Sequence, residues 1–269
     1  MAIRVVMAGA TGWVGRAMIP AILAQGDMTL AGAVARSAAG QDSGTALGLA
    51  PNGVAVSATL AEALALPSDV VVDYTKPDVV KANTLTAISK GRHVVIGTSG
   101  LGAADYAEID EAARGKGVGV LAAGNFSITA TLLRRFALEA ARYVPDVEII
   151  DYASPSKADT PSGTGRELAE LIGAMRQPAT SKPVGELSGV RETRGGSIGA
   201  PLPVQVHSVR MPSYVLSCEA LFGADNERLV IRHDAGASAA PYVAGTLLAA
   251  RKVAGFTGLK RGLDAVMDG

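Results

Sequence analysis

The sequence predicts an α/β protein in which a doubly wound parallel sheet is joined to a second, α+β domain with a mixed or antiparallel sheet. From residue 1 to about 125, short apolar β-branched runs alternate with longer alanine-rich amphipathic stretches, as in repeated βαβ units. A glycine-rich turn, Gly9–Gly15, follows the first apolar run. After Asn125 the pattern changes to apolar segments separated by turns. These three observations carry the prediction of the fold class.

The first half contains candidate strands that alternate with candidate helices. We expect strands at Arg4–Ala8, Thr29–Ala33, Val70–Asp73, His93–Gly97 and Gly119–Ala122, and helices from about Gly15 to Gln25, Pro77 to Lys90 and Ala104 to Lys116. Each helix is followed by a glycine, which suits a helix C-terminus.

The second half has a different order of elements. We expect helices from Thr129 to Tyr143 and from about Gly165 to Met175, and strands at Val147–Tyr152, Pro203–Arg210, Ser213–Phe222 and Arg228–His233. The segment Ala224–Glu227 predicts a hairpin turn. A final helix, Ala240 to Val253, has the alanine-rich pattern of the first half. We therefore group residues 1–125 with residues 238–269 in one domain, and assign residues 126–237 to the other.

Composition excludes several classes of protein. Lysine plus arginine and aspartate plus glutamate are balanced at 25 each, so bulk charge gives no reason to expect a nucleic acid or an anionic membrane as partner. No apolar run is long enough for a membrane span. The single cysteine, Cys218, is expected to be a buried strand residue, and no cluster has metal-ligand spacing. We expect a soluble protein of the reducing cytoplasm, with no metal.

The turn Gly9-Ala10-Thr11-Gly12-Trp13-Val14-Gly15 lies between a strand and a helix. Glycines allow a tight turn and a close approach of the backbone, and the helix N-terminus offers free N–H groups to a pyrophosphate. This context predicts a Rossmann dinucleotide site, although a tight turn without a ligand has the same sequence. The second strand is followed by Arg36 and Ser37 and not by a carboxylate, which favours NADPH over NADH.

A polar loop, Ala153–Gly165, precedes the second helix of the C-terminal domain. It contains Lys157, several hydroxyl groups and two glycines, a set of donors that suits a carboxylate or a phosphate. The same residues suit a plain helix start, because Thr164 and Glu167 have the spacing of a capping box. Pattern alone leaves both interpretations open.

Several motifs together resemble one known family, the dihydrodipicolinate reductases. They occur in the family's order at Gly9–Gly15, Asp73–Pro77, Gly97–Gly100, Asn125–Ser127 and Lys157–Thr164. The string Lys-x-Asp-x-Pro-Ser-Gly-Thr is the most specific of them. The resemblance implies a Rossmann domain at residues 1–125 plus 238–269, and a substrate-binding and oligomerisation domain at residues 126–237 that joins a homotetramer. It also implies reduction of a cyclic dicarboxylate in lysine biosynthesis.

Site residues follow from the turn, from the end of the second strand and from matching positions in the family. The cofactor residues are expected to be Gly9, Thr11, Gly12, Trp13, Val14, Gly15, Arg36, Ser37, Tyr74, Thr75, Gly97, Thr98, Ser99, Asn125 and Phe126. The substrate residues are expected to be Ser99, Ser154, Lys157, Ser162, Gly163 and Thr164. Gly97 and Thr98 would border the nicotinamide, and Ser162–Thr164 would bind a carboxylate.

One departure from the family bears on catalysis. The family normally has two adjacent histidines after the strand that precedes the loop, one of them proposed as the proton donor, whereas this chain has Ala153 and Ser154. Alanine cannot donate a proton and serine is a weak acid near neutral pH. Lys157, Tyr152 or a bound water are the remaining donors. Structural roles are expected for His93, His207 and His233, of which His207 is the one to test as a replacement acid, and Asp73 and Asp159 are expected to be hydrogen-bond acceptors.

The resulting hypothesis is hydride transfer from NAD(P)H to a C=N or conjugated C=C bond of a small carboxylated substrate, with the domains closing on hinges near Asn125 and Ala237. The substrate is either the dihydrodipicolinate-type compound or another imine handled by a divergent reductase. A catalytically inactive NAD(P)-binding regulator is the alternative from another class.

Overall fold

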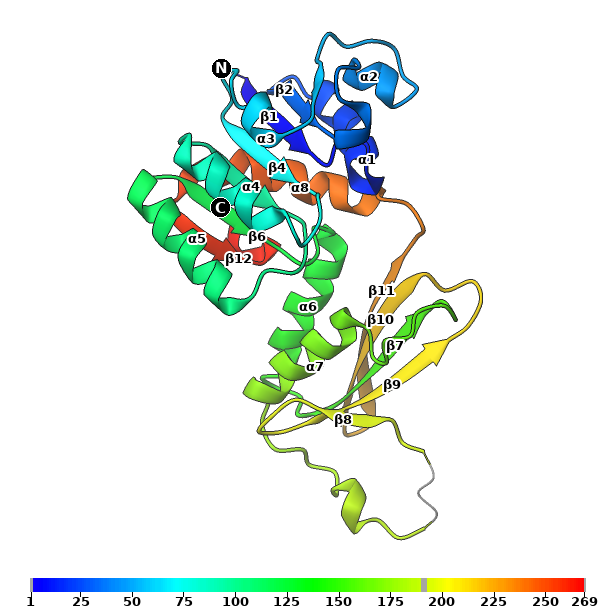
Figure 1. The fold of residues 1–269 in the computed structure, drawn as a ribbon. Helices are drawn as coiled ribbons and strands as arrows, with labels where there is room; N and C mark the ends of the chain where they lie inside the picture. The colour runs from blue at the N-terminus through cyan, green and yellow to red at the C-terminus, as the bar shows by residue number, and fades with distance from the viewer. Residues whose placement is uncertain (1, 190–192, 269) are drawn as a thin grey trace. The chain divides into compact units, whose positions relative to one another are not determined.

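The structure is a computed structural model that describes residues 2–189 and 193–268. The chain forms two compact units (Figure 1): unit 1 contains residues 1–128 and 239–269, and unit 2 contains residues 129–238. Unit 1 is therefore discontinuous in sequence.

Unit 1 is built on a seven-stranded sheet in the order β12-β6-β5-β4-β1-β2-β3, and all its strand pairs are parallel. The strands are β1 (Ile3–Ala8), β2 (Met28–Val34), β3 (Val56–Ser57), β4 (Val70–Asp73), β5 (His93–Ile96), β6 (Gly119–Ala122) and β12 (Gly258–Arg261). The order 3-2-1-4-5-6 is that of the Rossmann fold, and the order reverses between β1 and β4. The predicted fold class is confirmed.

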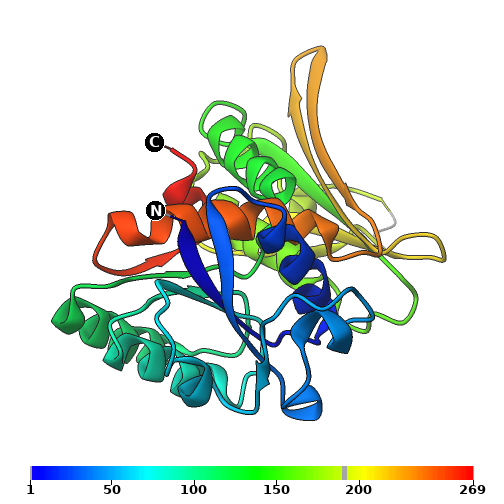
Figure 2. The same ribbon diagram turned by 90° about the horizontal axis from the view of Figure 1, so that it is seen from above.

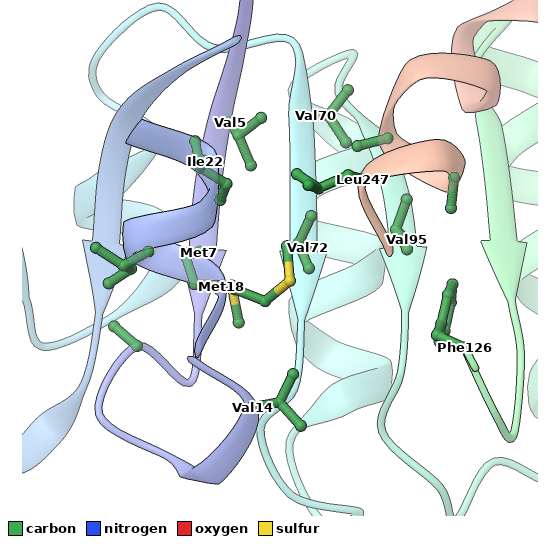
Figure 3. Packing of buried hydrophobic residues seen from close by; sticks show 14 of the residues in the cluster. Val5, Met7, Val14, Met18, Ile22, Val70, Val72, Val95, Phe126 and Leu247 are labelled. Atoms are coloured by element: carbon green, nitrogen blue, oxygen red, sulfur yellow. The ribbon is translucent and has the colours of Figure 1, made fainter. Parts of the chain in front are cut away.

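Helices cover both faces of this sheet. They are α1 (Trp13–Leu23), α2 (Ser43–Ala46), α3 (Leu60–Ala63), α4 (Val80–Ser89), α5 (Ala103–Lys116) and α8 (Ala240–Lys252). Helices α1 and α8 lie side by side on one face, as the blue and orange helices of Figure 2 show. On that face, Met18 and Ile22 of α1 and Leu247 of α8 pack against the strands (Figure 3). Helices α3, α4 and α5 pack on the other face.

Unit 2 is a five-stranded mixed sheet with helices on one face. Its strands are β7 (Asp146–Ala153), β8 (Gly196–Ile198), β9 (Val204–Arg210), β10 (Leu216–Ala224) and β11 (Glu227–Ala235), in the order β11-β10-β7-β9-β8. Among the described strands of this sheet, β7 and β9 form the only parallel pair, and the other pairs are antiparallel. Helices α6 (Ile128–Ala140) and α7 (Gly163–Met175) bury Leu133, Leu168 and Ile172 against it. The predicted hairpin turn is confirmed, with Asn226 at φ 61° between the antiparallel strands β10 and β11.

The shortest elements were not predicted from the sequence. Strands β3, β8 and β12 and helices α2 and α3 have two to four residues each, too few for a periodic pattern to stand out. The helix expected from about Gly165 begins two residues earlier, at Gly163. No helix within residues 2–189 and 193–268 is both long and apolar enough to cross a membrane.

Candidate functional site

The turn between β1 and α1 needs its glycines for the chain's own packing. Gly9 has φ +85°, and a Cβ added there would lie 2.2 Å from the carbonyl oxygen of Tyr74. A Cβ at Gly15 would lie 2.2 Å from the carbonyl oxygen of Gly9. The backbone of the turn therefore comes closer to β4 and α1 than any side chain would permit.

This turn presents the N-terminus of α1. Gly12 is the N-cap, and no side chain caps the helix there. The first turn carries no acidic residue, and Arg16, whose Nε donates to the carbonyl oxygen of Thr11 at 3.0 Å, adds a positive charge beside it. Unpaired N–H groups, the helix dipole and this guanidinium together suit a pyrophosphate.

The carboxyl end of β2 carries a cation. Strand β2 ends at Val34, and the next residues enter a short 3₁₀ turn, Arg36–Ala38. Arg36 and Ser37 are both exposed, and no carboxylate within residues 2–189 and 193–268 forms an ion pair with Arg36. An arginine at this point suits a ribose phosphate better than a free ribose diol.

Asp73 holds the ends of β4 and β5 together. Its carboxylate is fully buried at the last position of β4. It accepts hydrogen bonds from the backbone N–H and hydroxyl of Thr75, at 2.9 and 2.6 Å, from Asn83 Nδ2 at 2.9 Å and from Thr98 Oγ1 at 2.9 Å. The expectation that Asp73 is a hydrogen-bond acceptor is confirmed. Thr75 and Thr98 thus direct their hydroxyl protons to Asp73, and Asn83 is a partner that sequence reasoning missed.

Tyr74 fills the space beside Gly97. A Cβ at Gly97 would lie 2.2 Å from Cε1 of the Tyr74 ring, so the glycine makes room for the tyrosine. The Tyr74 hydroxyl is 2.7 Å from Oγ1 of Thr246 in α8, and its ring meets Phe126 edge-on at 6.0 Å. Burial raises the pKa of Tyr74. Tyr74 acts here as a packing residue, and its partner Thr246 is 172 residues away in sequence.

The other predicted cofactor residues differ in exposure. Trp13 is 57% exposed and meets the ring of Tyr242 edge-on at 5.6 Å. Ser99 is exposed, Phe126 is buried, and Asn125 Oδ1 accepts a hydrogen bond from the N–H of Ser127 at 2.8 Å. Together with the glycine turn, all of these residues except Ser127 and Tyr242 were predicted from the sequence.

In unit 2, the predicted substrate residues lie in the Lys157 loop, which we define as residues 154–162. The loop begins with a turn in which the N–H of Lys157 donates to the carbonyl oxygen of Ser154 at 3.1 Å. The Ser154 and Ser156 hydroxyl groups are 2.7 Å apart. Lys157 Nζ lies 3.1 Å from Oδ2 of Asp159, an exposed residue, so the ammonium is held near the surface by a carboxylate of its own loop.

The loop ends at the N-terminus of α7, which Ser162 caps. Ser162 Oγ accepts from the N–H of Gly165 at 3.3 Å and donates to the carboxylate of Asp151. The predicted capping box of Thr164 and Glu167 is therefore wrong, because the cap lies two residues earlier. Gly163 is exposed and Thr164 half-buried, so this end of the helix faces solvent within unit 2. Its N–H groups and the Thr164 hydroxyl suit an anion.

Two residues that sequence reasoning did not place in the site, Asp151 and Arg210, support this loop. Asp151 is fully buried in β7, and its Oδ2 accepts from the N–H of Ser162 at 2.8 Å and from Arg210 Nη2 at 2.7 Å. Arg210 ends β9 and also donates to main-chain oxygens of the Lys157 loop. No local pattern signals these partners, since β9 lies about fifty residues after the loop.

Adjacent residues at the end of β7 point to opposite faces of the sheet. Asp151 and Ala153 are on the face covered by the helices, and both are fully buried. Tyr152 is on the other face, where its hydroxyl donates to Glu219 Oε2 at 3.2 Å and its ring lies under the guanidinium of Arg232. Burial and the nearby Glu219 raise the pKa of Tyr152. Tyr152 and Ser162 therefore contact different faces of the same sheet.

The histidines and the cysteine have structural partners or are buried. His93 Nδ1 accepts from the N–H of Gly119 at 2.9 Å, and His207 Nε2 lies 2.8 Å from Glu148 Oε2. Burial lowers the pKa of both His93 and His233. Cys218 is buried in β10 as expected, and burial raises the pKa of its thiol to about 12.

Comparison with known sequence families covers both units. The family model described as the N-terminus of dihydrodipicolinate reductase matches residues 3–126, and the model of its C-terminus matches residues 129–266.

Known relatives are similar to this chain in sequence over nearly its whole length. It is 41% identical to a 4-hydroxy-tetrahydrodipicolinate reductase of Synechococcus elongatus, over 98% of each chain, and 38% identical to one of Desulfitobacterium hafniense, over 99% of each chain. A solved structure of a dipicolinate-bound dihydrodipicolinate reductase from Paenisporosarcina sp. TG-14 superposes with a TM-score of 0.85 at 28% identity, covering 99% of this chain and 100% of that one. An amine dehydrogenase from Mycobacterium smegmatis, 16% identical over 96% of this chain and 94% of that one, shares the fold with a TM-score of 0.65. The chain belongs to the dihydrodipicolinate reductase family and is an NAD(P)H-dependent reductase of that type.

Proposed function

We propose that the chain uses NADPH to reduce the C=N, or a conjugated C=C, bond of a cyclic dicarboxylate of the 4-hydroxy-tetrahydrodipicolinate type. The observation that carries this proposal is the Lys157 loop, which brings an ammonium group and the exposed N-terminus of α7 into one short segment. Both groups attract carboxylates. The names of the relatives support the choice of substrate.

Unit 1 supplies the cofactor residues in this proposal. The turn Gly9–Gly15 and the N-terminus of α1 would hold the pyrophosphate, and Arg36 with Ser37 would hold the ribose phosphate of NADPH. The residues present fit such a group, because the turn leaves no room for side chains and the helix has no side-chain cap. NADPH supplies a hydride when it is bound. Gly97 and Thr98 would border the nicotinamide, with Thr98 fixed by its hydrogen bond to Asp73.

Unit 2 supplies the substrate residues. One carboxylate of the substrate would be bound by the N–H groups of Gly163 and Thr164 and by the Thr164 hydroxyl. The Ser162 hydroxyl already donates to Asp151, so it would support the helix end and not contact the substrate. Lys157 would leave Asp159 and pair with the substrate.

Lys157 is also the proposed proton donor for the reduced bond. Ala153 has no acidic group, and Tyr152 donates its hydroxyl proton to Glu219 on the opposite face of the sheet. Among the donors expected from the sequence, Lys157 is the one whose charged end lies in the loop that would bind the substrate. The alternative donor is a bound water that receives its proton through the hydroxyl of Ser154.

The test is steady-state oxidation of NADPH in the presence of 4-hydroxy-tetrahydrodipicolinate. We expect turnover by the wild-type enzyme and a loss of kcat/KM of about a hundredfold or more for Lys157→Ala, as for the removal of a general acid. Lys182→Ala removes an exposed lysine elsewhere in unit 2 and serves as the matched control. A wild-type rate no higher than that of Lys157→Ala would refute the proposed function.

A second candidate is a divergent imine reductase, favoured by Ala153 and Ser154 at the positions of the family's histidines. It predicts that a panel of other cyclic and open-chain imines includes a better substrate than the dicarboxylate.

We also propose that the chain assembles into a homotetramer through the sheet of unit 2 and acts in the cytoplasm. The edge strand β11 supports the first point, because Leu229 and Val230 are each 47% exposed in the single chain.

A further inference from the structure

One arginine ties the Lys157 loop to the sheet of unit 2. The side chain of Arg210 is only 14% exposed. Its Nε donates to the carbonyl oxygen of Lys157 at 3.2 Å, and its Nη2 donates to the carbonyl oxygen of Asp159. Nη1 donates to the carbonyl oxygen of Asp151 at 3.2 Å. Nη1 also donates to the carbonyl oxygen of Val209, at 2.9 Å. The guanidinium thus donates to four carbonyl groups, and two of them, those of Lys157 and Asp159, belong to the loop.

The same guanidinium forms an ion pair with the residue that holds the N-terminus of α7. Arg210 Nη2 lies 2.7 Å from Oδ2 of Asp151, whose side chain is 0% exposed. Asp151 in turn accepts both the N–H and the hydroxyl of Ser162, the N-cap of α7. The middle of the Lys157 loop, at Lys157 and Asp159, and its C-terminal end, at Ser162, are therefore fixed to one buried ion pair.

The charge of this pair matters because of its position. The carboxylate of Asp151 lies against the first turn of α7, where a Cβ at Gly165 would be 3.4 Å from its Oδ1. A helix N-terminus attracts anions, whereas an unpaired buried carboxylate beside it would repel them. Arg210 neutralises Asp151 and leaves the N–H groups of Gly163 and Thr164 available to an external anion.

We propose that Arg210 is a positioning residue for the substrate carboxylate. It sets the N-terminus of α7 through Asp151 and fixes the main chain of the Lys157 loop, and it contacts no reacting atom itself. This inference rests on the function proposed above and identifies the residue that makes its carboxylate site.

The test compares Arg210→Met with Arg176→Met. Arg176 is the C-cap of α7, and its guanidinium donates to three main-chain oxygens, those of Pro145, Leu202 and Pro203, at 2.7, 3.1 and 2.7 Å. Replacing Arg176 therefore also removes an arginine that donates to several main-chain oxygens, as replacing Arg210 does. It leaves the contacts of Asp151 and of the Lys157 loop unchanged. Isothermal titration calorimetry measures the Kd of each variant for pyridine-2,6-dicarboxylate with NADPH present, and for NADPH alone.

We expect the Kd for the dicarboxylate and the KM for the substrate to rise about tenfold or more in Arg210→Met, with a smaller change in kcat. The reason is that the N-terminus of α7 and the Lys157 loop would no longer be held in position to bind a carboxylate. The Kd for NADPH should stay at the wild-type value in both variants, and Arg176→Met should keep the wild-type Kd for the dicarboxylate. Arg210→Lys keeps the charge but not the fork of donors, and it should weaken dicarboxylate binding less than Arg210→Met.

Equal dicarboxylate affinity in Arg210→Met, Arg176→Met and the wild type would overturn this inference and leave the proposed function in place. If Arg210→Met does not fold, as judged by circular dichroism and NADPH binding, an Arg210→Lys variant with wild-type dicarboxylate affinity would overturn it. Absence of dicarboxylate binding and of turnover in the wild type itself would refute the proposed function and this inference with it.

Discussion

The glycines of unit 1 differ in what an added methyl group would meet. At Gly15 it would collide with the carbonyl oxygens of Gly9 and Ala10, at 2.2 and 2.5 Å, whereas at Gly26 it would meet nothing within 4 Å. We expect Gly15→Ala to lower the free energy of unfolding by about 1–3 kcal/mol or more, as overpacking does. Gly26→Ala should leave it within about 0.5 kcal/mol of the wild type. Urea unfolding followed by circular dichroism measures both, and equal stability of the two variants would contradict the prediction.

Two arginines of unit 1 are expected to bind different parts of the dinucleotide. Arg36 follows β2, where only NADPH carries a phosphate, whereas Arg16 lies beside the turn that would bind the pyrophosphate of either cofactor. We expect Arg36→Ala to raise the KM for NADPH about tenfold, through the loss of a charge-assisted hydrogen bond, and to leave the KM for NADH unchanged. Arg16→Ala should raise both. Equal effects of Arg36→Ala on the two cofactors would show that Arg36 does not select NADPH.

At the scale of elements, Asp146 anchors the segment after α7 to the start of β7. Partial burial alone would raise its pKa, but the side chains and N–H groups of Ser181 and Thr180 donate to the carboxylate and hold the pKa at about 2. The carboxylate is therefore less easily protonated in the folded chain than in the unfolded one, whose pKa is near 3.8. Its stabilisation is fully present above pH 4 and is lost as the pH falls towards 2.

Asp146→Asn checks this assignment. We expect the variant to be less stable than the wild type by about 1 kcal/mol at pH 7, a value reduced by solvent screening of this partly exposed group. The difference should shrink between pH 4 and pH 2. Chemical denaturation across that range measures it, and a difference independent of pH would contradict the assigned pKa.

The elements also show what local sequence can predict. The long helix α5 and the valine-rich strand β4 were predicted within a residue of their bounds. Their hydrophobic residues follow a clear helical or strand pattern over the whole element. The start of α7 was not predicted as closely. Ser162 and Thr164 are both possible N-caps, and the carboxylate of Asp151, which precedes the loop, holds Ser162 in the N-cap position. The candidate site shows the same contrast between local pattern and distant contacts. Its motif residues were predicted from resemblance, whereas their partners come from strands and helices far along the chain.

At the scale of the whole molecule, the proposed tetramer is open to direct measurement. Val230 of the edge strand β11 pairs with Leu221, whose neighbours Ala220 and Phe222 face the helices, so Val230 lies on the opposite face of the sheet. Light scattering coupled to size-exclusion chromatography should give the mass of four chains for the wild type and a smaller mass for Val230→Lys. Leu66→Lys, at a position 62% exposed in unit 1, is the control and should stay tetrameric. A wild-type monomer would contradict the proposal.

The discontinuity of unit 1 has a consequence for how the protein is made. Strand β12 pairs with β6, and α8 covers the same face of the sheet as α1, yet both follow the whole of unit 2 in the chain. During synthesis, residues 2–128 emerge from the ribosome while Val253, Leu247 and their neighbours, which complete that face, are still untranslated. Unit 2 is continuous and has every strand of its own sheet by residue 235. We therefore expect unit 2 to reach its native structure first, although the N-terminal residues of unit 1 leave the ribosome before it.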